Sequence, residues 1–147
     1  MTSWKEFEQQ AIELAAFGKT RFASGVAYLG TVRPNGSPRV HPVTPIIGEQ
    51  LFLFMEPTSP KGKELRLDDR YVLHCSVENS EGGGGEFYVR GHAVQSDDPE
   101  LRAQALRMAS YTPADRYILF VLSVDFAFMN TYGDSGSQTR WWKSETR

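Results

Sequence analysis

The sequence predicts a mainly β protein whose antiparallel sheet closes into a barrel, with one helix at the N-terminus and further helices inserted between strands. Short apolar or alternating runs recur along the chain, short turns join most of them, and few segments show helical spacing. An antiparallel sheet of about six or seven strands commonly closes into a barrel. The 147 residues suit one core, so we expect a single domain spanning 1–147.

The first helix is expected to start at residue 3. Ser3 and Glu6 fit a capping box, in which the serine hydroxyl accepts a backbone hydrogen bond and the glutamate side chain reaches back. Gly18 is suited to end the helix, because glycine readily adopts the left-handed conformation of a C-terminal cap. Apolar residues at spacings of three and four give this helix one apolar stripe: Trp4, Phe7, Ala11 and Leu14.

Three strands are expected next, over 25–33, 38–47 and 51–56, and we expect them to form an antiparallel meander. The Pro-Asn-Gly-Ser sequence at 34–37 is a strong turn signal, because Asn-Gly tolerates the positive φ of a tight hairpin. The second strand should be bulged, paired on one side only or at a sheet edge, because proline cannot donate to the ladder. It contains three prolines: Pro38, Pro42 and Pro45.

The rest of the chain mixes strands with two short helices. Ser59 is suited to cap a helix that has Pro60 in its first position, and an Asp-Pro-Glu sequence at 98–100 opens another helix. A glycine-rich connection is expected at 78–85, and the tail after residue 132 is polar except for two adjacent tryptophans. The further strands are expected at 71–77, 86–96, 117–124 and 126–132.

Composition excludes several classes of partner. The chain has 16 basic and 18 acidic side chains and a net charge of −2 without a basic stripe, so no nucleic acid partner is expected. No apolar run approaches the ~18 residues that cross a bilayer, so no membrane partner is expected. The N-terminus lacks the basic and apolar segments of a secretory signal, and we expect a cytoplasmic protein.

No metal site and no disulfide are expected. Cys75 is the sole cysteine, which excludes a disulfide framework and a cysteine-based zinc site. The three histidines, His41, His74 and His92, lie on expected strands at spacings that imply no metal site. Structural roles are expected for them, and His41 has the best claim to a functional one.

The start of the helix at residue 60 is the clearest candidate site. Free backbone N–H groups and the helix dipole favour an anion there. A hydroxyl from Thr58 or Ser59 and the ammonium of Lys61 complete such a site, and Arg39 on the proline-interrupted strand is suited to bind the same phosphate. Two plainer interpretations stay open: a capped helix with a solvated lysine, and an edge strand that proline and charge protect from aggregation.

Four segments between Gly25 and Val94 carry a further signal: TVRPNGSPRVHPV, LFLFME, TSPKGKELRLDDRYVL and EFYVRGHAV. In their order and spacing they resemble the pyridoxamine 5′-phosphate oxidase-like family of FMN-binding split barrels. The resemblance implies a six-stranded antiparallel split β-barrel with N-terminal and inserted helices. It also implies a homodimer that holds FMN in the clefts between its subunits.

The resemblance assigns roles to residues by position. Arg39 and Lys61 are expected to contact the FMN phosphate, helped by Ser59. The side chains of Phe54 and Met55 are expected to flank the ribityl chain or the ring, and Trp141 or Trp142 to approach the flavin from the C-terminal part. Five consecutive residues are expected to line the ring: Val40, His41, Pro42, Val43 and Thr44.

The function implied is that of an FMN-dependent oxidoreductase with a small-molecule substrate or a nicotinamide donor stacked on the exposed ring face. No general base is predicted, and the catalytic residues stay unassigned. Thr44 stands where the oxidase itself has a lysine, so oxidation of pyridoxamine phosphate is not expected. Two alternatives stay open: a deazaflavin-dependent reductase on the same fold, and a non-catalytic flavin or haem carrier or sensor.

Overall fold

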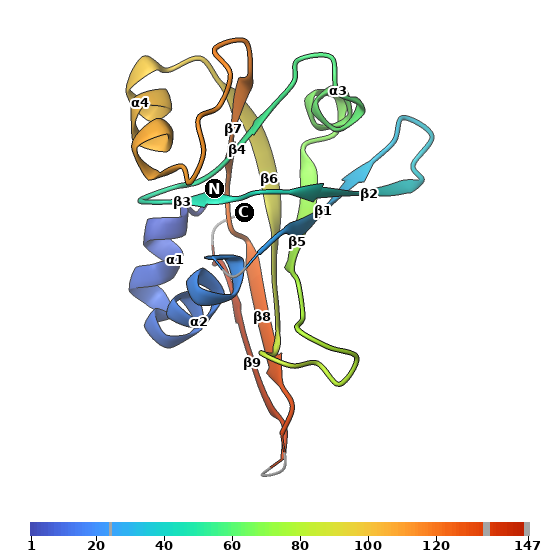
Figure 1. Cartoon of the computed structure of the whole chain (residues 1–147), viewed down its shortest axis with the longest axis vertical. Helices are drawn as coiled ribbons and strands as arrows, with labels where there is room; N and C mark the ends of the chain where they lie inside the picture. Colours follow the sequence, from blue (N-terminus) through green and yellow to red (C-terminus); the bar gives the residue numbers. More distant parts are fainter. Residues whose placement is uncertain (24, 134–135, 146–147) are drawn as a thin grey trace.

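A computed structural model describes residues 1–23, 25–133 and 136–145. In these residues the chain forms four helices and nine strands (Figure 1). The helices are α1 (Trp4–Gln10), α2 (Ile12–Ala23), α3 (Pro60–Leu67) and α4 (Pro99–Met108). The strands are β1 (Ala27–Val32), β2 (Pro38–Val43), β3 (Ile46–Ile47), β4 (Leu51–Met55), β5 (Arg70–Cys75), β6 (Glu86–Ser96), β7 (Ile118–Leu122), β8 (Phe126–Thr131) and β9 (Gln138–Lys143).

The strands form one curled antiparallel sheet that branches at β6. One branch runs β2-β1-β5-β6 and continues through β8 to β9, while the other runs from β6 through β7 and β4 to β3. The two branches curve around a shared interior, with α1 and α2 against one side and α3 close to the β1–β2 hairpin (Figure 1). The expected antiparallel barrel with inserted helices is therefore confirmed, although the described part has more strands than the six expected.

Gly91 marks the point where β6 changes partners. Residues 86–90 pair with β8, whereas residues 93–96 pair with β7. A Cβ atom at Gly91 would lie 2.3 Å from the backbone oxygen of Ser123, in the turn between β7 and β8. A glycine is therefore required where the sheet divides, because the two backbones approach too closely for any side chain.

The N-terminal helix is divided in two. The capping box is confirmed, with the backbone N–H of Glu6 donating to Ser3 Oγ and that of Ser3 donating to Glu6 Oε1. Ala11 leaves helical geometry at φ −139°, and α2 then runs on to Ala23. The expectation that Gly18 ends the helix is wrong. Gly18 lies inside α2 because the ring of Phe87 packs there, 2.3 Å from where a Cβ would be.

The β1–β2 hairpin and the edge position of β2 are as expected. Gly36 has φ +86°, and its N–H donates to the carbonyl of Arg33 at 2.8 Å. Within the described residues β2 pairs with β1 alone. The expected meander is wrong, however, because the run 38–47 is interrupted at Thr44-Pro45 and its last two residues form β3. β3 pairs with β4 and β4 pairs with β7, so β2 and β3 lie at opposite ends of the sheet order and β4 is far from β2.

The tail contains a strand that the sequence analysis did not assign. β9 pairs with β8 over six residues, and its side chains alternate between the two faces of the sheet. Trp142 faces inward, with its ring centroid 5.0 Å from that of Phe7. Trp141 faces outward and is 65% exposed. The alternation is hard to recognise in the sequence, because Trp142 is the single large apolar side chain with which β9 covers the core and the other inward positions are polar.

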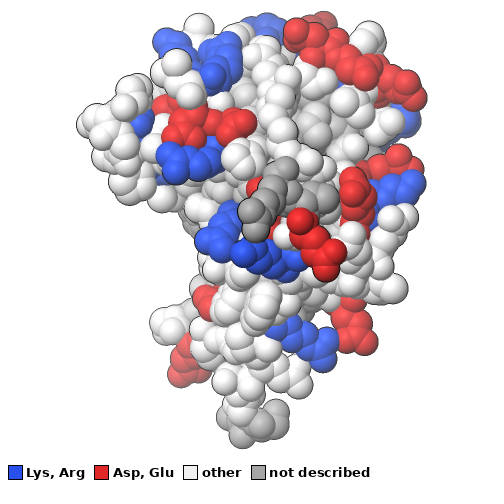
Figure 2. All heavy atoms as spheres, turned by 180° about the vertical axis from the view of Figure 1, so that it is seen from behind, with Lys and Arg blue, Asp and Glu red and all other residues white. Residues whose placement is uncertain are grey.

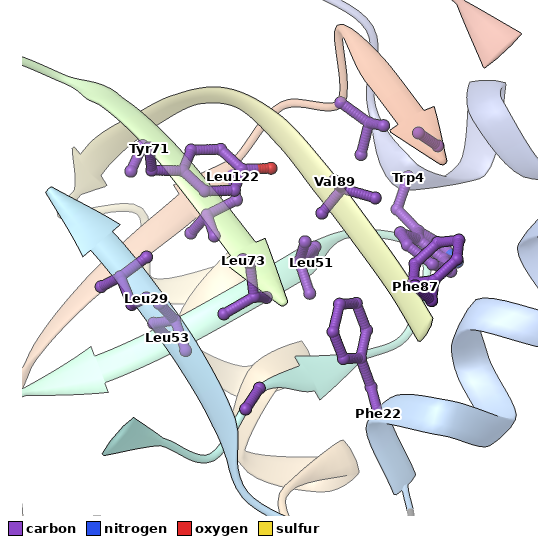
Figure 3. Close-up of a cluster of buried hydrophobic side chains, with 14 of the residues drawn as sticks. Trp4, Phe22, Leu29, Leu51, Leu53, Tyr71, Leu73, Phe87, Val89 and Leu122 are labelled. Atoms are coloured by element: carbon purple, nitrogen blue, oxygen red, sulfur yellow. The ribbon is translucent and has the colours of Figure 1, made fainter. Parts of the chain in front are cut away.

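Two buried clusters hold the fold together. The main one fills the barrel with side chains from the strands and from α1 and α2, including Phe22, Leu73, Phe87 and Leu122 (Figure 3). The smaller one lies under α4 and contains Ile46, Phe52, Phe54, Ala105 and Leu119. Acidic and basic side chains are interspersed over the face that Figure 2 shows, consistent with the absence of a basic stripe. None of the described helices is long and apolar enough to cross a membrane.

Candidate functional site

The start of α3 forms a capped corner beside β2. The N–H of Gly62 donates to Ser59 Oγ at 3.3 Å, and that hydroxyl donates its own proton to the carbonyl of Glu56 at 2.8 Å. Pro60 occupies the first turn, where no intrahelical donor is needed. The capping role expected for Ser59 is therefore confirmed. Because its proton already has an acceptor, Ser59 shapes this corner and has no free hydrogen for an anion as arranged here.

A buried carboxylate joins α3 to the first hairpin. Glu64 is 5% exposed, and Thr31 Oγ1 on β1 donates to its Oε1 at 2.7 Å. Nε of Arg39 on β2 lies 2.8 Å from Glu64 Oε2, and Nε2 of His41 lies 3.6 Å from Oε1. Thr31 Oγ1 and His41 Nε2 are themselves 3.3 Å apart. One side chain of α3 thus connects both strands of the hairpin.

The charges of this cluster act on one another. Burial alone raises the pKa of Glu64, but the hydrogen bond from Thr31 and the charge of Arg39 outweigh it and hold the pKa below its ordinary value. Burial lowers the pKa of His41, Glu64 acts in the opposite direction, and the charges of Lys61 and Arg39 lower that pKa further. The structure therefore brings Arg39, His41 and Lys61 close enough to interact, as the corner requires.

One side of the Arg39 guanidinium contacts Glu64, and its other side is open. Its Nε is buried and is not aligned for a hydrogen bond with Glu64, so their contact is an ion pair. Its side chain is 34% exposed, and its two terminal amino groups donate to no other described residue. Lys61 is half-buried and pairs with no described carboxylate. These two side chains and the backbone N–H of Lys61, the one N–H in the first turn of α3 without an acceptor among the described residues, fit an anionic group such as a phosphate.

The expected ring-lining residues divide between the faces of β2. His41 and Val43 face inward with Arg39, whereas Val40 faces outward and is 67% exposed. Pro38 and Pro42 share the orientation of Val40, and proline is tolerated where the missing N–H points away from the neighbouring strand. The N–H and C=O of Val40 therefore point to the free edge of β2. Thr44 continues this edge and is exposed.

Two other expected residues, Phe54 and Trp141, lie away from the corner in a single chain, whereas Met55 is buried next to it, with Sδ 3.3 Å from where a Cβ at Gly62 would be. Phe54 is 8% exposed under α4, with the Arg102 guanidinium 5.1 Å from its ring centroid, and Met55 is 3% exposed in the main core. Trp141 lies on β9, with four strands between it and β2 in the branch order. The structure thus brings Arg39, His41, Ser59 and Lys61 together, but buries Phe54 and Met55 and leaves Trp141 at the other end of the branch.

Comparison with solved structures gives clear matches in fold. A NimC/NimA family protein from Clostridium acetobutylicum superposes with a TM-score of 0.68 at 16% identity, covering 95% of this chain and 94% of that one. A Lactobacillus delbrueckii protein provisionally assigned as a pyridoxamine 5′-phosphate oxidase has a TM-score of 0.59 at 16% identity, covering 74% and 88%. The chain has the split-barrel fold of the pyridoxamine 5′-phosphate oxidase-like proteins. This confirms the fold that the sequence resemblance implied.

Another split barrel among the matches is a haem-binding protein from Mycobacterium smegmatis. Its TM-score is 0.67 at 21% identity, and the match covers 86% of this chain but only 57% of that protein. The present chain therefore spans less than two thirds of that relative. No protein-family model matches the sequence, and no curated protein matches it.

Glu64 is the residue of this split barrel that sequence analysis missed. A glutamate between Lys63 and Leu65 on a short helix reads as a solvated side chain, because nothing local shows which face of the helix is buried. The signal that was available lies on another element. Arg39 and His41 are two positions apart and therefore lie on the same face of β2. Where that face is covered by other residues, two basic side chains favour an acidic partner nearby.

Proposed function

We propose that this protein binds FMN and is an FMN-dependent oxidoreductase that acts on a small molecule. The observation that carries the proposal is the position of Arg39, Lys61 and the start of α3 beside the free edge of β2. Arg39 would bind the phosphate through its terminal amino groups while Glu64 holds the other side of its guanidinium. Lys61 would add a second positive charge, and the N-cap at Ser59 keeps the first turn of α3 in place.

The free edge of β2 suits the ring. Val40 offers one backbone donor and one acceptor there, and the flanking prolines remove the competing donors. The pyrimidine end of a flavin presents an N–H beside carbonyl groups, which is the matching pattern. Bound FMN would supply the hydride and electron transfer, and the chain would supply binding, orientation and the exclusion of water.

We further propose that the protein is a homodimer with the cofactor at the subunit interface. The outer face of the β2-β1-β5-β6-β8-β9 branch carries exposed apolar side chains, among them Val40 at 67%, Tyr28 at 45% and Val72 at 39%. Contiguous exposed apolar surface of this kind marks an interaction site. A second copy on this face would also bring side chains such as Trp141 of one subunit toward the cofactor of the other.

Haem binding is the second candidate. One structural relative is described as a haem-binding protein, and the outer face carries two histidines that are partly exposed, His74 and His92. Imidazole is a common axial ligand of haem iron. The absorbance of the cofactor released by denaturing the purified protein decides between the two, because haem, FMN and deazaflavin have different spectra. Haem or deazaflavin in the extract would overturn the FMN proposal.

A pair of lysine variants tests the phosphate corner. Lys61→Ala is expected to weaken FMN binding by about 1.5–3 kcal/mol, the contribution of a charge-assisted contact. Lys63→Ala, two positions further along α3 on an exposed side chain, is the matched control and should bind FMN as the parent does. Anaerobic mixing with NADH or NADPH then tests the activity, since a carrier would leave the flavin oxidised.

A further inference from the structure

A cavity of about 420 Å³ lies at the end of β2 away from Arg39. It is lined by the end of α2, the residues just before β1, the linker from β2 together with β3, and the end of α4 with the turn that follows it. Its volume falls within the range of roughly 300–1,000 Å³ that is typical of small-molecule sites. It is separate from the Glu64 cluster, because Arg39, His41, Lys61 and Glu64 are not among the residues that line it.

The lining of the cavity is mixed, with somewhat more apolar than polar surface, and two of its apolar side chains are exposed. Phe22 and Ile46 form part of the wall and are 4% and 2% exposed. Val26 and Met108, which also line the cavity, are 44% and 51% exposed. A ligand that covers these two side chains would remove apolar surface from water, and the unbranched Met108 adapts readily to different shapes.

Lys19 is the one charged residue among those that line the cavity. It lies near the end of α2, is exposed, and has no ion pair with any carboxylate in the described part of the chain. The hydroxyls of Thr44 and Ser110 also line the cavity, and the described residues provide no hydrogen-bond partner for either. A cavity with somewhat more apolar than polar lining and a single unpaired ammonium suits a molecule with an apolar body and one negative charge.

We propose that this cavity is the substrate site and that it takes an aromatic carboxylate, with the ring against Phe22 and Ile46 and the carboxylate at Lys19. The assignment as substrate site rests on the proposed function, because Thr44 directly follows β2, whose edge would hold the cofactor, and also lines the cavity. A molecule held there would lie next to the ring end of the cofactor, at the opposite end of β2 from the phosphate corner.

Calorimetric titration of the FMN-loaded protein with 2-naphthoate and with 2-naphthamide tests the proposal. The naphthoate is expected to bind about tenfold more tightly than the neutral amide, because its carboxylate makes one charge-assisted contact with Lys19. Lys19→Met should remove that difference by weakening only the naphthoate, and Lys5→Met, an exposed lysine on α1, should change neither probe. Met108→Trp should fill the opening and abolish the binding of both probes.

Separate measurements keep the two proposals distinguishable. FMN binding is followed by flavin absorbance in every variant, and Lys19→Met and Met108→Trp are expected to bind FMN as the parent does. Equal naphthoate affinity in the parent and Lys19→Met, or no naphthoate binding by FMN-loaded protein, overturns the cavity assignment alone. Naphthoate binding that depends on Lys19 in a protein that binds no FMN supports the cavity and overturns the proposed cofactor.

Discussion

Glu64 carries its charge where water is nearly excluded, and a buried carboxylate is tolerated only with partners. Thr31 supplies a hydrogen bond, and Arg39 supplies an opposite charge from a different strand. These contacts fix the position of α3 relative to the β1–β2 hairpin. The helix start and the edge of β2, which together form the corner, therefore depend on a residue that need not touch a ligand itself.

Replacing Glu64 with glutamine tests this role. Glu64→Gln keeps an acceptor for Thr31 but leaves Arg39 without its opposite charge, so the free energy of unfolding in urea should fall by about 1–3 kcal/mol. Glu49→Gln is the control, because Glu49 pairs with Lys5 at 3.4 Å on the surface and is 66% exposed. It should change stability by less than about 0.5 kcal/mol. Equal losses in the two variants would contradict the role given to Glu64.

The pKa of His41 offers a second test of the same cluster. Burial holds it below the ordinary value of 6.5, so His41 is neutral at neutral pH. The unfolded chain then binds this proton more tightly than the folded one. The neutral His41 therefore contributes to the stability of the folded protein above pH 6.5. This contribution is lost as the pH falls from 6.5 toward the lower pKa that His41 has in the folded protein.

Titration of the His41 ring by NMR measures this value directly. Because the Glu64 carboxylate raises the pKa of His41, Glu64→Gln should lower it further than in the parent. His74, whose pKa is raised mainly by its hydrogen bond to Cys75, has no part in this cluster and serves as the internal reference. An unchanged or higher His41 pKa in the variant would show that the two side chains do not interact in solution.

Elements were predictable from sequence where local chemistry determines them. The Ser59 cap with Pro60 defined α3, and the Asn35-Gly36 turn defined the first hairpin. The path of the chain was not predictable where contacts between residues far apart in the sequence determine it. Gly18 reads as a helix end, yet α2 continues because the Phe87 ring needs a surface without a side chain. Likewise β9 is stabilised by pairing with β8 and by one partly buried ring, that of Trp142, which leaves almost no local pattern in the sequence.

The candidate site divides in the same way. Arg39, Ser59 and Lys61 were predictable because helix starts and strand ends have chemical signatures of their own. The partners of these residues depend on register across the sheet, which brings Thr31 opposite Arg39 and both under Glu64. The burial of Phe54 likewise depends on α4, which packs over β3 although it lies nearly fifty residues further along the sequence.

A glycine pair tests the branching of the sheet. Gly91→Ala places a Cβ 2.3 Å from the Ser123 backbone oxygen, where neither backbone is able to move without disturbing β6 or the β7–β8 turn. The free energy of unfolding should fall by at least about 1–3 kcal/mol, as overpacking typically causes. Gly25→Ala has open space around its Cβ and an unstrained backbone, so its stability should stay close to that of the parent. Similar stabilities in the two variants would contradict the close approach at Gly91.

At the scale of the whole molecule, one broad face is left uncovered. On the outer side of the β2-β1-β5-β6-β8-β9 branch, Tyr88 stacks between His74 and Phe128, with ring centroids 6.1 and 5.3 Å apart. Phe126 stacks on Trp141 at 6.2 Å, and the Arg90 guanidinium lies 4.3 Å from the Phe126 ring centroid. With Val40 and Tyr28 this makes an apolar and aromatic surface across several strands, whose burial would favour a second copy of the chain.

Sedimentation of the parent and two glutamate variants tests this association. The parent should sediment as a dimer, and Val40→Glu should sediment as a monomer, because a charge placed on an apolar interface is left without a partner. Leu106→Glu, on the partly exposed side of α4 outside this face, should stay dimeric. If the cofactor lies between subunits, Val40→Glu should also lose FMN affinity while its circular dichroism stays that of a folded protein. A monomeric parent, or a Val40→Glu variant that remains dimeric, would place any association on another surface.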